Sequence, residues 1–213
     1  MMTNADRHYE KLKVKLNERV VGWAMTPSET ESFFESLGKE VITLIGYSME
    51  YEDSKAMLQK VESVLSEYDP DRTIINIGGT KGGIGAAYPI AKARGFKTTA
   101  IVSTCAVEWL DDISSSVDHI CFVEDDQWGG KLPDSSQLSP TSQAMVNCSD
   151  IFIGIGGGTI SRDEMLAARD LGKPVYFYPA ERNHQYMIRR AQKRNLDPPE
   201  SFWGEAHEAF VKG

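Results

Sequence analysis

The sequence of 213 residues has few cysteines, no long apolar run and no excess of positive charge. Its three cysteines, Cys105, Cys121 and Cys148, form no Cys-x-x-Cys or Cys/His ligand spacing, which argues against a disulfide framework and a structural zinc site. No apolar stretch approaches the roughly 20 residues that cross a bilayer. The polar N-terminus lacks the apolar core of a signal peptide. We therefore expect reduced thiols in a cytoplasmic protein that has no membrane partner.

Basic residues are outnumbered, with 23 Lys and Arg against 31 Asp and Glu, so the formal net charge is −8. A surface of this sign repels the phosphate backbone of nucleic acids and anionic lipid headgroups. We therefore expect no nucleic-acid partner. A small phosphorylated ligand stays compatible with this charge, because backbone amides and a few cations can bind an anion inside an acidic protein.

Apolar runs alternate with helical patterns between residues 41 and 195, which predicts a single α/β domain over that range. The expected strands are 41–45, 73–77, 98–102, 119–123, 150–155 and 174–178. The expected helices are 54–68, 86–93, 106–116, 140–148, 159–171 and 182–195. Strands this apolar, joined by helices, belong to parallel sheets covered on both faces. The prediction is a three-layer Rossmann-like parallel sheet.

The chain ends are expected to be appendages, with an arm and short helix over 1–40 and a docking segment over 196–213. Thr26 to Glu29 form a capping box with proline at the first helical position, so a helix should begin there. Residues 8–21 fit a strand or a helix equally well. Within the domain, Pro89 either kinks its helix or marks a helix that begins nearer Tyr88.

Two glycine-rich turns, each between an apolar strand and a helix, form the main candidate site. Such a turn brings backbone N–H groups to a helix N-terminus, where the helix dipole also favours phosphate. The residues expected to bind ligand are Gly78, Gly79, Thr80, Lys81, Gly82 and Gly83 in the first turn and Gly156, Gly157, Gly158 and Thr159 in the second. Neither turn has Walker A or dinucleotide-fold spacing. The alternative for the first turn is a packing corner with a solvated lysine.

Other candidates follow from the rule that ligands of open parallel sheets bind beyond the carboxyl ends of the strands. Gly46, Tyr47 and Ser48 follow the first expected strand, and Arg182 and His184 follow the last. Gly46, Tyr47 and Ser48 are expected to bind ligand, although Tyr47 is as often a rim residue as a stacking platform at such a position. Arg182 and His184 either contact ligand phosphate or, for the exposed histidine, are inert. The sequence predicts that they converge with the glycine turns.

Carboxylates suggest two further roles. Thr159 or Ser161 is expected to cap the helix 159–171. Asp163 and Glu164 lie in the first turns of that helix, where they either complement the helix dipole or contact a ribose or sugar cation. The run 124–126 either binds Mg²⁺ at a diphosphate or is a solvated acidic loop. Magnesium bound together with a nucleotide is the only cofactor considered.

The glycine turns, the stretch from Asp150 to Glu164 and the segment from Gly172 to Val175 resemble the SLOG superfamily over about residues 41–180. This group includes cytokinin-activating phosphoribohydrolases, often mislabelled lysine decarboxylases, and nucleotide-sensing modules of bacterial defence systems. The resemblance implies a Rossmann-like fold and phosphate and ribose binding at 156–159. It also implies a homo-oligomer, most simply a dimer.

The enzymes of this superfamily carry the pattern PGGxGTxxE, preceded by a helix that contains an arginine. Here the turn from Ile155 to Thr159 lacks the proline and is one residue shorter, and the helix 140–148 has no arginine. The leading hypothesis is therefore binding of a nucleotide or nucleotide-derived ligand. The alternative is a nucleoside 5′-monophosphate phosphoribohydrolase, for which the resemblance implies Glu164 as the catalytic group.

Overall fold

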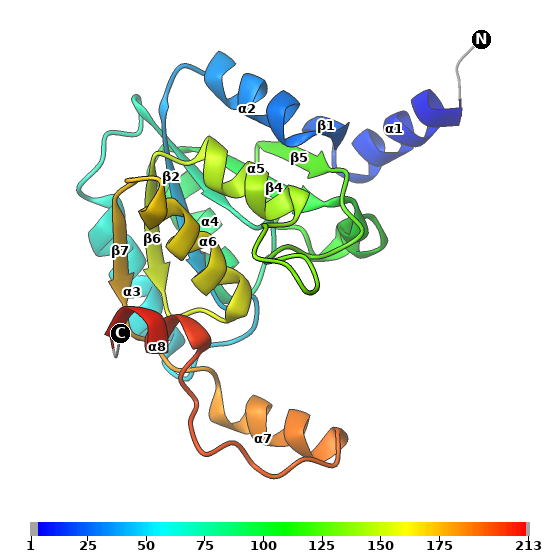
Figure 1. Cartoon of the computed structure of the whole chain (residues 1–213). Coiled ribbons are helices and arrows are strands. Elements are labelled where there is room, and N and C mark those ends of the chain that lie inside the picture. The colour runs from blue at the N-terminus through cyan, green and yellow to red at the C-terminus, as the bar shows by residue number, and fades with distance from the viewer. Residues whose placement is uncertain (1–3, 212–213) are drawn as a thin grey trace.

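The order of the strands places the two glycine turns on either side of one central strand. The computed structural model describes residues 4–211, which form a seven-stranded sheet in the order β1-β5-β4-β3-β2-β6-β7 (Figure 1). Every neighbouring pair of strands is parallel. The strands are β1 (Val20–Met25), β2 (Glu40–Gly46), β3 (Thr73–Ile77), β4 (Lys97–Ser103), β5 (His119–Val123), β6 (Ile151–Ile155) and β7 (Val175–Tyr178).

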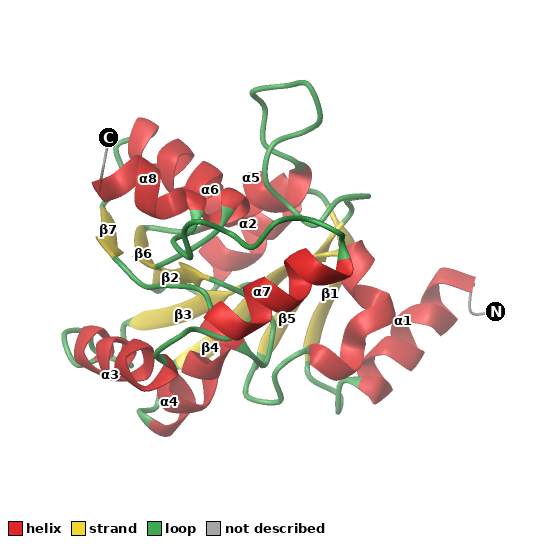
Figure 2. Ribbon diagram, turned by 90° about the horizontal axis from the view of Figure 1, so that it is seen from below, coloured by secondary structure: helices red, strands yellow, loops and turns green. Residues whose placement is uncertain are grey.

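Helices cover both faces of this sheet, as Figure 2 shows, so the predicted three-layer α/β fold is confirmed. One face carries α2 (Pro27–Ser36), α5 (Pro140–Cys148), α6 (Thr159–Asp170) and α8 (Glu205–Val211). The other carries α1 (Asn4–Lys15), α3 (Ser54–Leu65), α4 (Ala87–Ala93) and two 3₁₀ helices, η1 (Gly83–Ala86) and η2 (Thr104–Asp112). Helix α7 (His184–Lys193) lies apart from both layers and buries none of its residues.

Alternation along β2 explains the two cores. Val41 and Ile45 pack with the α2, α5 and α6 side, whereas Ile42 and Leu44 pack with the α1, α3 and α4 side. Successive side chains of a strand point to opposite faces, so a strand buried on both faces is apolar throughout. That continuous apolar character is the feature by which the sequence predicted the strand. Across residues 4–211, no helix combines the length and the apolarity that a bilayer-spanning segment needs.

The N-terminal region contains a strand that the sequence did not predict. The ambiguous stretch begins as helix α1, which buries Leu12 and ends at Lys15, and Asn17 and Glu18 then adopt left-handed backbone conformations. The chain continues as β1, which pairs with β5 at the edge of the same sheet. Residues 20–25 are therefore part of the sheet.

The capping box of α2 and the start of α4 agree with the sequence, whereas the helix after β4 differs from it. The Thr26 hydroxyl accepts from the Glu29 N–H, and the Glu29 carboxylate accepts from the Thr26 N–H, which completes the expected capping box of α2. Helix α4 begins at Ala87, so Pro89 falls in its first turn, where a missing N–H costs no helical hydrogen bond. The helix expected over 106–116 is instead the 3₁₀ helix η2, which starts and ends earlier.

The chain crosses the sheet after β5, and this crossover creates the switch point. Strands β2 to β5 are laid down in sequence toward one edge, and β6 then pairs with the opposite side of β2. The carboxyl ends of β3, β2 and β6 are therefore neighbours. These are the ends that carry the first glycine turn, residues 46–48 and the second glycine turn.

Candidate ligand-binding site

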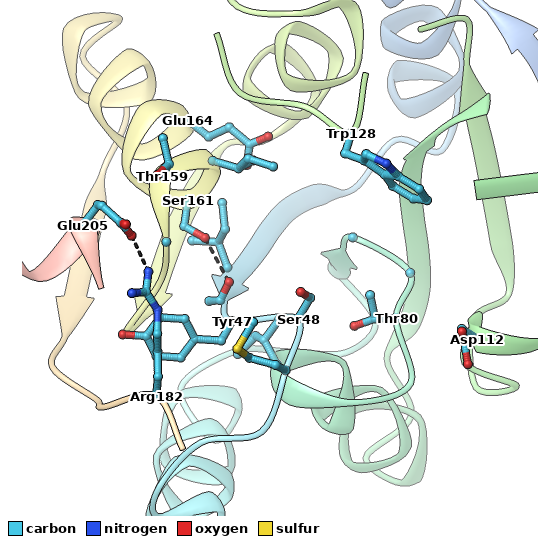
Figure 3. A pocket seen from close by; sticks show the side chains of 18 of the residues that line it. Tyr47, Ser48, Thr80, Asp112, Trp128, Thr159, Ser161, Glu164, Arg182 and Glu205 are labelled. Carbon is cyan, nitrogen blue, oxygen red and sulfur yellow. Dashed lines mark hydrogen bonds and ion pairs between the residues drawn. The ribbon is translucent and has the colours of Figure 1, made fainter. Parts of the chain in front are cut away.

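A cavity of about 830 Å³ lies at the carboxyl ends of the strands. Figure 3 shows that its wall combines residues from the loop after β2, the two glycine turns and helix α6. A volume of this size is in the range of pockets that hold drug-sized ligands. The cavity is therefore large enough for a nucleotide.

Both glycine turns reach this cavity, although only some of their residues face it. The predicted site residues that line it are Gly46, Tyr47, Ser48, Gly78, Gly79, Thr80, Gly158, Thr159 and Glu164. The predicted residues that do not line it are Lys81, Gly82, Gly83, Gly156, Gly157 and Asp163. The structure thus brings together the first half of one turn and the second half of the other.

Only the first half of the first turn faces the cavity, because its second half packs against the loop after β2. A side chain on Gly83 would clash with the Tyr47 carbonyl oxygen, and the Ile84 N–H donates to that same oxygen at 2.8 Å. Lys81 Nζ lies 3.2 Å from Asp112 Oδ1 and donates to the Asp111 carbonyl at 3.0 Å. Lys81 therefore does not line the cavity, and its ammonium is paired with protein groups.

Only the second half of the second turn faces the cavity, because Tyr47 and the C-terminal segment cover its first half. The Tyr47 ring fills the space beside Gly156, and the Ala206 N–H donates to the Gly157 carbonyl at 3.2 Å. Gly156 and Gly157 also have positive φ values, of 59° and 131°, which few other residues adopt. These two glycines shape the turn, and Gly158 and Thr159 supply the backbone that faces the cavity.

The expected capping of α6 is wrong. The N-cap is Gly158, no side chain among the described residues caps the helix, and Thr159 is its first helical residue. The Ser161 hydroxyl instead donates to the Gly46 carbonyl at 2.9 Å, as the dashed line in Figure 3 marks. The N-terminus of α6 consequently opens into the cavity without a side-chain cap. Its N–H groups and the helix dipole favour an anion there.

Two tyrosines hold the cavity wall together. The Tyr51 hydroxyl donates to the Ile155 carbonyl at 2.8 Å and accepts from the Tyr47 N–H at 3.1 Å, which links the ends of β2 and β6. The Tyr47 hydroxyl donates to the Ala180 carbonyl and accepts from the Gly204 N–H, each at 2.9 Å. Burial raises the pKa of both phenols, so they remain neutral hydrogen-bonding groups.

Glu164 is a buried carboxyl on the cavity wall. It is 4% exposed, and Oε1 accepts from the Ser142 hydroxyl at 2.5 Å. Burial, with a smaller contribution from Asp163, raises the pKa of Glu164 to about 8, although the hydrogen bond from Ser142 acts in the opposite direction. Glu164 is therefore predominantly protonated at neutral pH.

Asp163 does not share this environment. Its Oδ1 accepts from the neighbouring Arg162 guanidinium at 2.8 Å, and its side chain lies outside the cavity. The two consecutive acids therefore face different surroundings. Of the pair, Glu164 can reach a ligand in the cavity.

The acidic run 124–126 has a structural role that the sequence analysis did not identify. Asp125 is buried, its Oδ2 accepts from the Thr141 N–H at 2.9 Å, and its Oδ1 accepts from the Gln127 N–H at 2.9 Å. It thereby holds the N-terminus of α5 and the start of the 126–138 loop. Within residues 4–211, no group of three or more His, Cys, Asp or Glu side chains could hold a metal ion. Both carboxylate oxygens of Asp125 are thus engaged by backbone N–H groups, and magnesium bound together with a nucleotide stays a prediction.

The last strand end contributes one of its two candidates. Arg182 lines the cavity, forms an ion pair with Glu205 and lies with its guanidinium carbon 5.3 Å from the centre of the Tyr47 ring. His184 does not line the cavity: its Nε2 is 3.0 Å from Glu181 Oε2 and its ring stacks on Phe202. His184 therefore orders the chain before α7.

Several cavity residues were missed by sequence reasoning because they lie outside the two strand–glycine–helix turns. Trp109 lies in η2, and Trp128 lies in the loop after β5. Helix α7 contributes Met187 and Arg190, and α5 contributes Thr141. In the sequence their only signal is that each follows a strand end or lies in a helix after one.

Comparison with known proteins locates similar folds. No family model and no curated protein matches the sequence. Among solved structures, the Moco carrier protein from Chlamydomonas reinhardtii is 20% identical, with 66% of this chain and 76% of that chain covered and a TM-score of 0.47. DNA processing protein A from Streptococcus pneumoniae is 17% identical, with 82% of this chain and 62% of that chain covered and a TM-score of 0.47.

Similarity at this level assigns neither a ligand nor an activity to the present chain. The Rossmann-like architecture is shown by its own parallel sheet and strand order.

Proposed function

We propose that the cavity binds a nucleotide or a nucleotide-derived ligand, with its phosphate at the glycine turns. The observation that carries this proposal is that the two turns, from opposite sides of β2, line one cavity. Backbone around Gly78 and Gly79 faces the cavity from one side, and Gly158 and Thr159 at the uncapped N-terminus of α6 face it from the other. An anion that reaches the N-terminus of α6 meets backbone N–H groups that no side chain caps in the described part of the chain. At the first turn the Gly79 N–H already donates to the Tyr88 hydroxyl at 3.2 Å, so contact there falls to the residues beside Gly79.

The charges on the cavity wall are compatible with an anionic ligand. Arg182 is neutralised by Glu205, and Asp112 by Lys81. Arg190 and Arg194 of the α7 region also line the cavity. With Glu164 protonated, these two arginines outnumber the one further carboxylate there, Asp197.

A cavity-blocking variant tests the proposal. A side chain at Gly78 would meet open space, so Gly78→Val should fill part of the cavity without disturbing the fold. Gly82→Ala is the matched control, because Gly82 belongs to the same turn but does not line the cavity. Gly157 is a poorer choice, since its φ of 131° strains any larger residue.

The measurement is a thermal-shift panel of nucleoside mono- and diphosphates, NAD and ADP-ribose, each with and without Mg²⁺. A ligand well above its Kd should stabilise the wild-type protein by roughly 2–4 kcal/mol. Gly82→Ala should retain this stabilisation and Gly78→Val should lose it. Absence of a shift with the whole panel, or an unchanged shift in Gly78→Val, would contradict the proposal.

A second candidate function, hydrolysis of the N-glycosidic bond of a nucleoside monophosphate, is favoured by the environment of Glu164. A buried carboxyl whose pKa is raised to about 8 is a suitable general acid for a leaving base, as in glycosidases. It is poorly suited to the anionic role of stabilising a sugar cation. Release of free base, followed by chromatography, tests this activity. Glu164→Gln should abolish turnover, and Asp197→Asn, which alters another cavity carboxylate, should retain it.

A further inference from the structure

Two exposed indoles face the same cavity from different connections. Trp109 and Trp128 are 56% and 57% exposed, and both line the cavity. They follow β4 and β5, which are neighbours in the sheet. Figure 3 shows Trp128 on the side of the cavity opposite Arg182. By contrast, the ring of Trp203 stacks on His207 at 4.2 Å. Trp109 and Trp128 thus present large apolar rings beside a ligand cavity.

A hydroxyl without a partner among the described residues lies next to the loop that carries Trp128, because the residue after it, Ser142, accepts from the Gly130 N–H at 2.6 Å. Thr141 is 5% exposed and lines the cavity, and its Oγ1 has no hydrogen-bond partner among residues 4–211. Its backbone N–H is held by Asp125, which fixes the residue at the start of α5. A buried hydroxyl without a hydrogen-bond partner destabilises the protein, and a hydrogen bond from a ligand atom removes that cost. Thr141 is therefore available to a polar group that enters this end.

Apolar residues of the cavity wall suit a flat ring. Met145 lies one helical turn after Thr141 in α5, and it lines the cavity together with Ile45 and Ile101, which are buried on the same side of the sheet. A pocket with apolar walls and a few directed polar groups is typical of sites that orient an aromatic ligand. Glu164 lies at the same end, since a side chain on Gly129, next to Trp128, would come within 3.8 Å of its Oε1.

We propose that this end of the cavity, bounded by Trp109, Trp128 and Thr141, is a subsite for a planar heteroaromatic ring such as a nucleobase. The ring stacks on an indole, because every base presents a π-face to an aromatic side chain. The Thr141 hydroxyl, which can donate or accept, pairs with the polar edge of the ring. The inference rests on the proposed function, which places the phosphate of the same ligand at the glycine turns.

Three ligands separate the contributions of ring and phosphate. The first is whichever of AMP, GMP, CMP and UMP binds most tightly, the second is its nucleoside, which lacks phosphate, and the third is ribose 5-phosphate, which lacks the ring. Affinities are measured by calorimetry, and quenching of tryptophan fluorescence reports contact with the indoles. The variants are Trp109→Ala, Trp128→Ala and Thr141→Val. Tyr176→Ala is the control, because Tyr176 is an exposed aromatic residue of β7 outside the cavity.

Removal of the stacking indole should weaken the nucleotide and the nucleoside by about tenfold or more. Thr141→Val should weaken both ligands by about five- to tenfold, the loss expected for one hydrogen bond. Ribose 5-phosphate should bind each variant as it binds the wild type, and Tyr176→Ala should change nothing. Fluorescence quenching by the nucleoside should decrease in the variant that lacks the stacking indole.

The outcomes distinguish this inference from the proposed function. If ribose 5-phosphate binds as tightly as the nucleotide, or if neither tryptophan variant affects the nucleotide, the ring subsite is overturned and phosphate binding stands. The subsite stands and the proposed function fails under a different set of results. In that case the nucleoside binds and is weakened by Trp109→Ala or Trp128→Ala. Ribose 5-phosphate does not bind, and the nucleotide binds no better than the nucleoside. If none of the three ligands binds, both are overturned.

Discussion

The Ser142 hydroxyl on α5 donates to Glu164 Oε1 on α6 across 2.5 Å, and the same Ser142 oxygen accepts from the Gly130 N–H at 2.6 Å. This pair joins two helices to the loop that carries Trp128. The carboxyl is buried and its hydrogen-bond partner is a neutral hydroxyl, so a negative charge on it would be poorly compensated. The protonation of Glu164 and the stability of this corner are therefore coupled.

The stability of the protein should depend on pH through Glu164. The ordinary pKa of this carboxyl is 4.5, and burial raises it to about 8 in the folded state. Between these values the unfolded chain loses the proton while the folded protein keeps it, so the free energy of unfolding decreases as pH rises. Glu164→Gln does not titrate. Its stability relative to wild type should therefore increase with pH, by up to about 1.4 kcal/mol per pH unit.

Urea denaturation at pH 5, 6, 7 and 8 measures this difference. Glu124→Gln is the matched control, since Glu124 is an exposed carboxyl of the neighbouring loop that does not line the cavity. A stability difference between Glu164→Gln and wild type that stays constant from pH 5 to pH 8 would show that Glu164 is charged in the folded protein.

Thr141 and Ser142 are adjacent hydroxyl residues for which opposite effects on stability are expected. Thr141→Val removes a buried hydroxyl that has no partner among the described residues, so the unliganded protein should be as stable as wild type or more so. Ser142→Ala removes two hydrogen bonds and leaves the Gly130 N–H without its acceptor. It should destabilise by about 1–3 kcal/mol. Melting temperatures of both variants test the contrast, and a clear loss of stability in Thr141→Val would contradict it.

Tyr51→Phe should weaken the junction between β2 and β6. The Tyr51 hydroxyl is the partner of both the Ile155 carbonyl and the Tyr47 N–H, and the residue is buried. In Tyr51→Phe, the Ile155 carbonyl and the Tyr47 N–H would lose this hydrogen-bond partner, which should lower the free energy of unfolding by about 1–3 kcal/mol. Chemical denaturation measures the loss, and Tyr186→Phe, on the exposed surface of α7, should show none. Equal stability of the two variants would rule out this role for Tyr51.

Arg190 should contribute to anion binding without contributing to stability. It lines the cavity from α7, whereas its neighbour Arg189 is exposed and does not. Arg190→Ala should weaken a nucleoside monophosphate by roughly three- to tenfold at low salt, and the loss should shrink as salt screens the charge. Calorimetric titrations at two salt concentrations measure this effect. Arg189→Ala should bind as wild type does, and an equal loss in both variants would point to a general charge effect.

Six of the seven strands could be predicted because each is a mostly apolar run. The interior runs 41–45 and 73–77 are buried on both faces, and their polar members, such as Thr43 and Asn76, are buried too. The exception, β1, is an edge strand. Its exposed Val20 and interior Gly22 disrupt the pattern, and its register with β5 shifts between Gly22 and Met25. The other edge strand, β7, was predicted because all four of its residues are apolar or aromatic, so β1 was missed for its interrupted pattern and not for its place in the sheet.

The position of the site could also be predicted, since glycine turns at strand ends have a local signature. Which residues of each turn face the cavity could not. That division depends on Tyr47, which fills the space beside Gly156, and on the C-terminal segment, which bonds to Gly157. The environment of Glu164 likewise depends on Ser142, from a different helix. Such contacts are made by tertiary packing and leave no periodicity in the sequence.

Helix α7 supplies Met187, Arg190 and Ala191 to the cavity and yet buries none of its residues. No residue of α7 therefore belongs to either core. A substitution on the cavity side of this helix alters the wall that a ligand meets and removes no packing from the sheet beneath it.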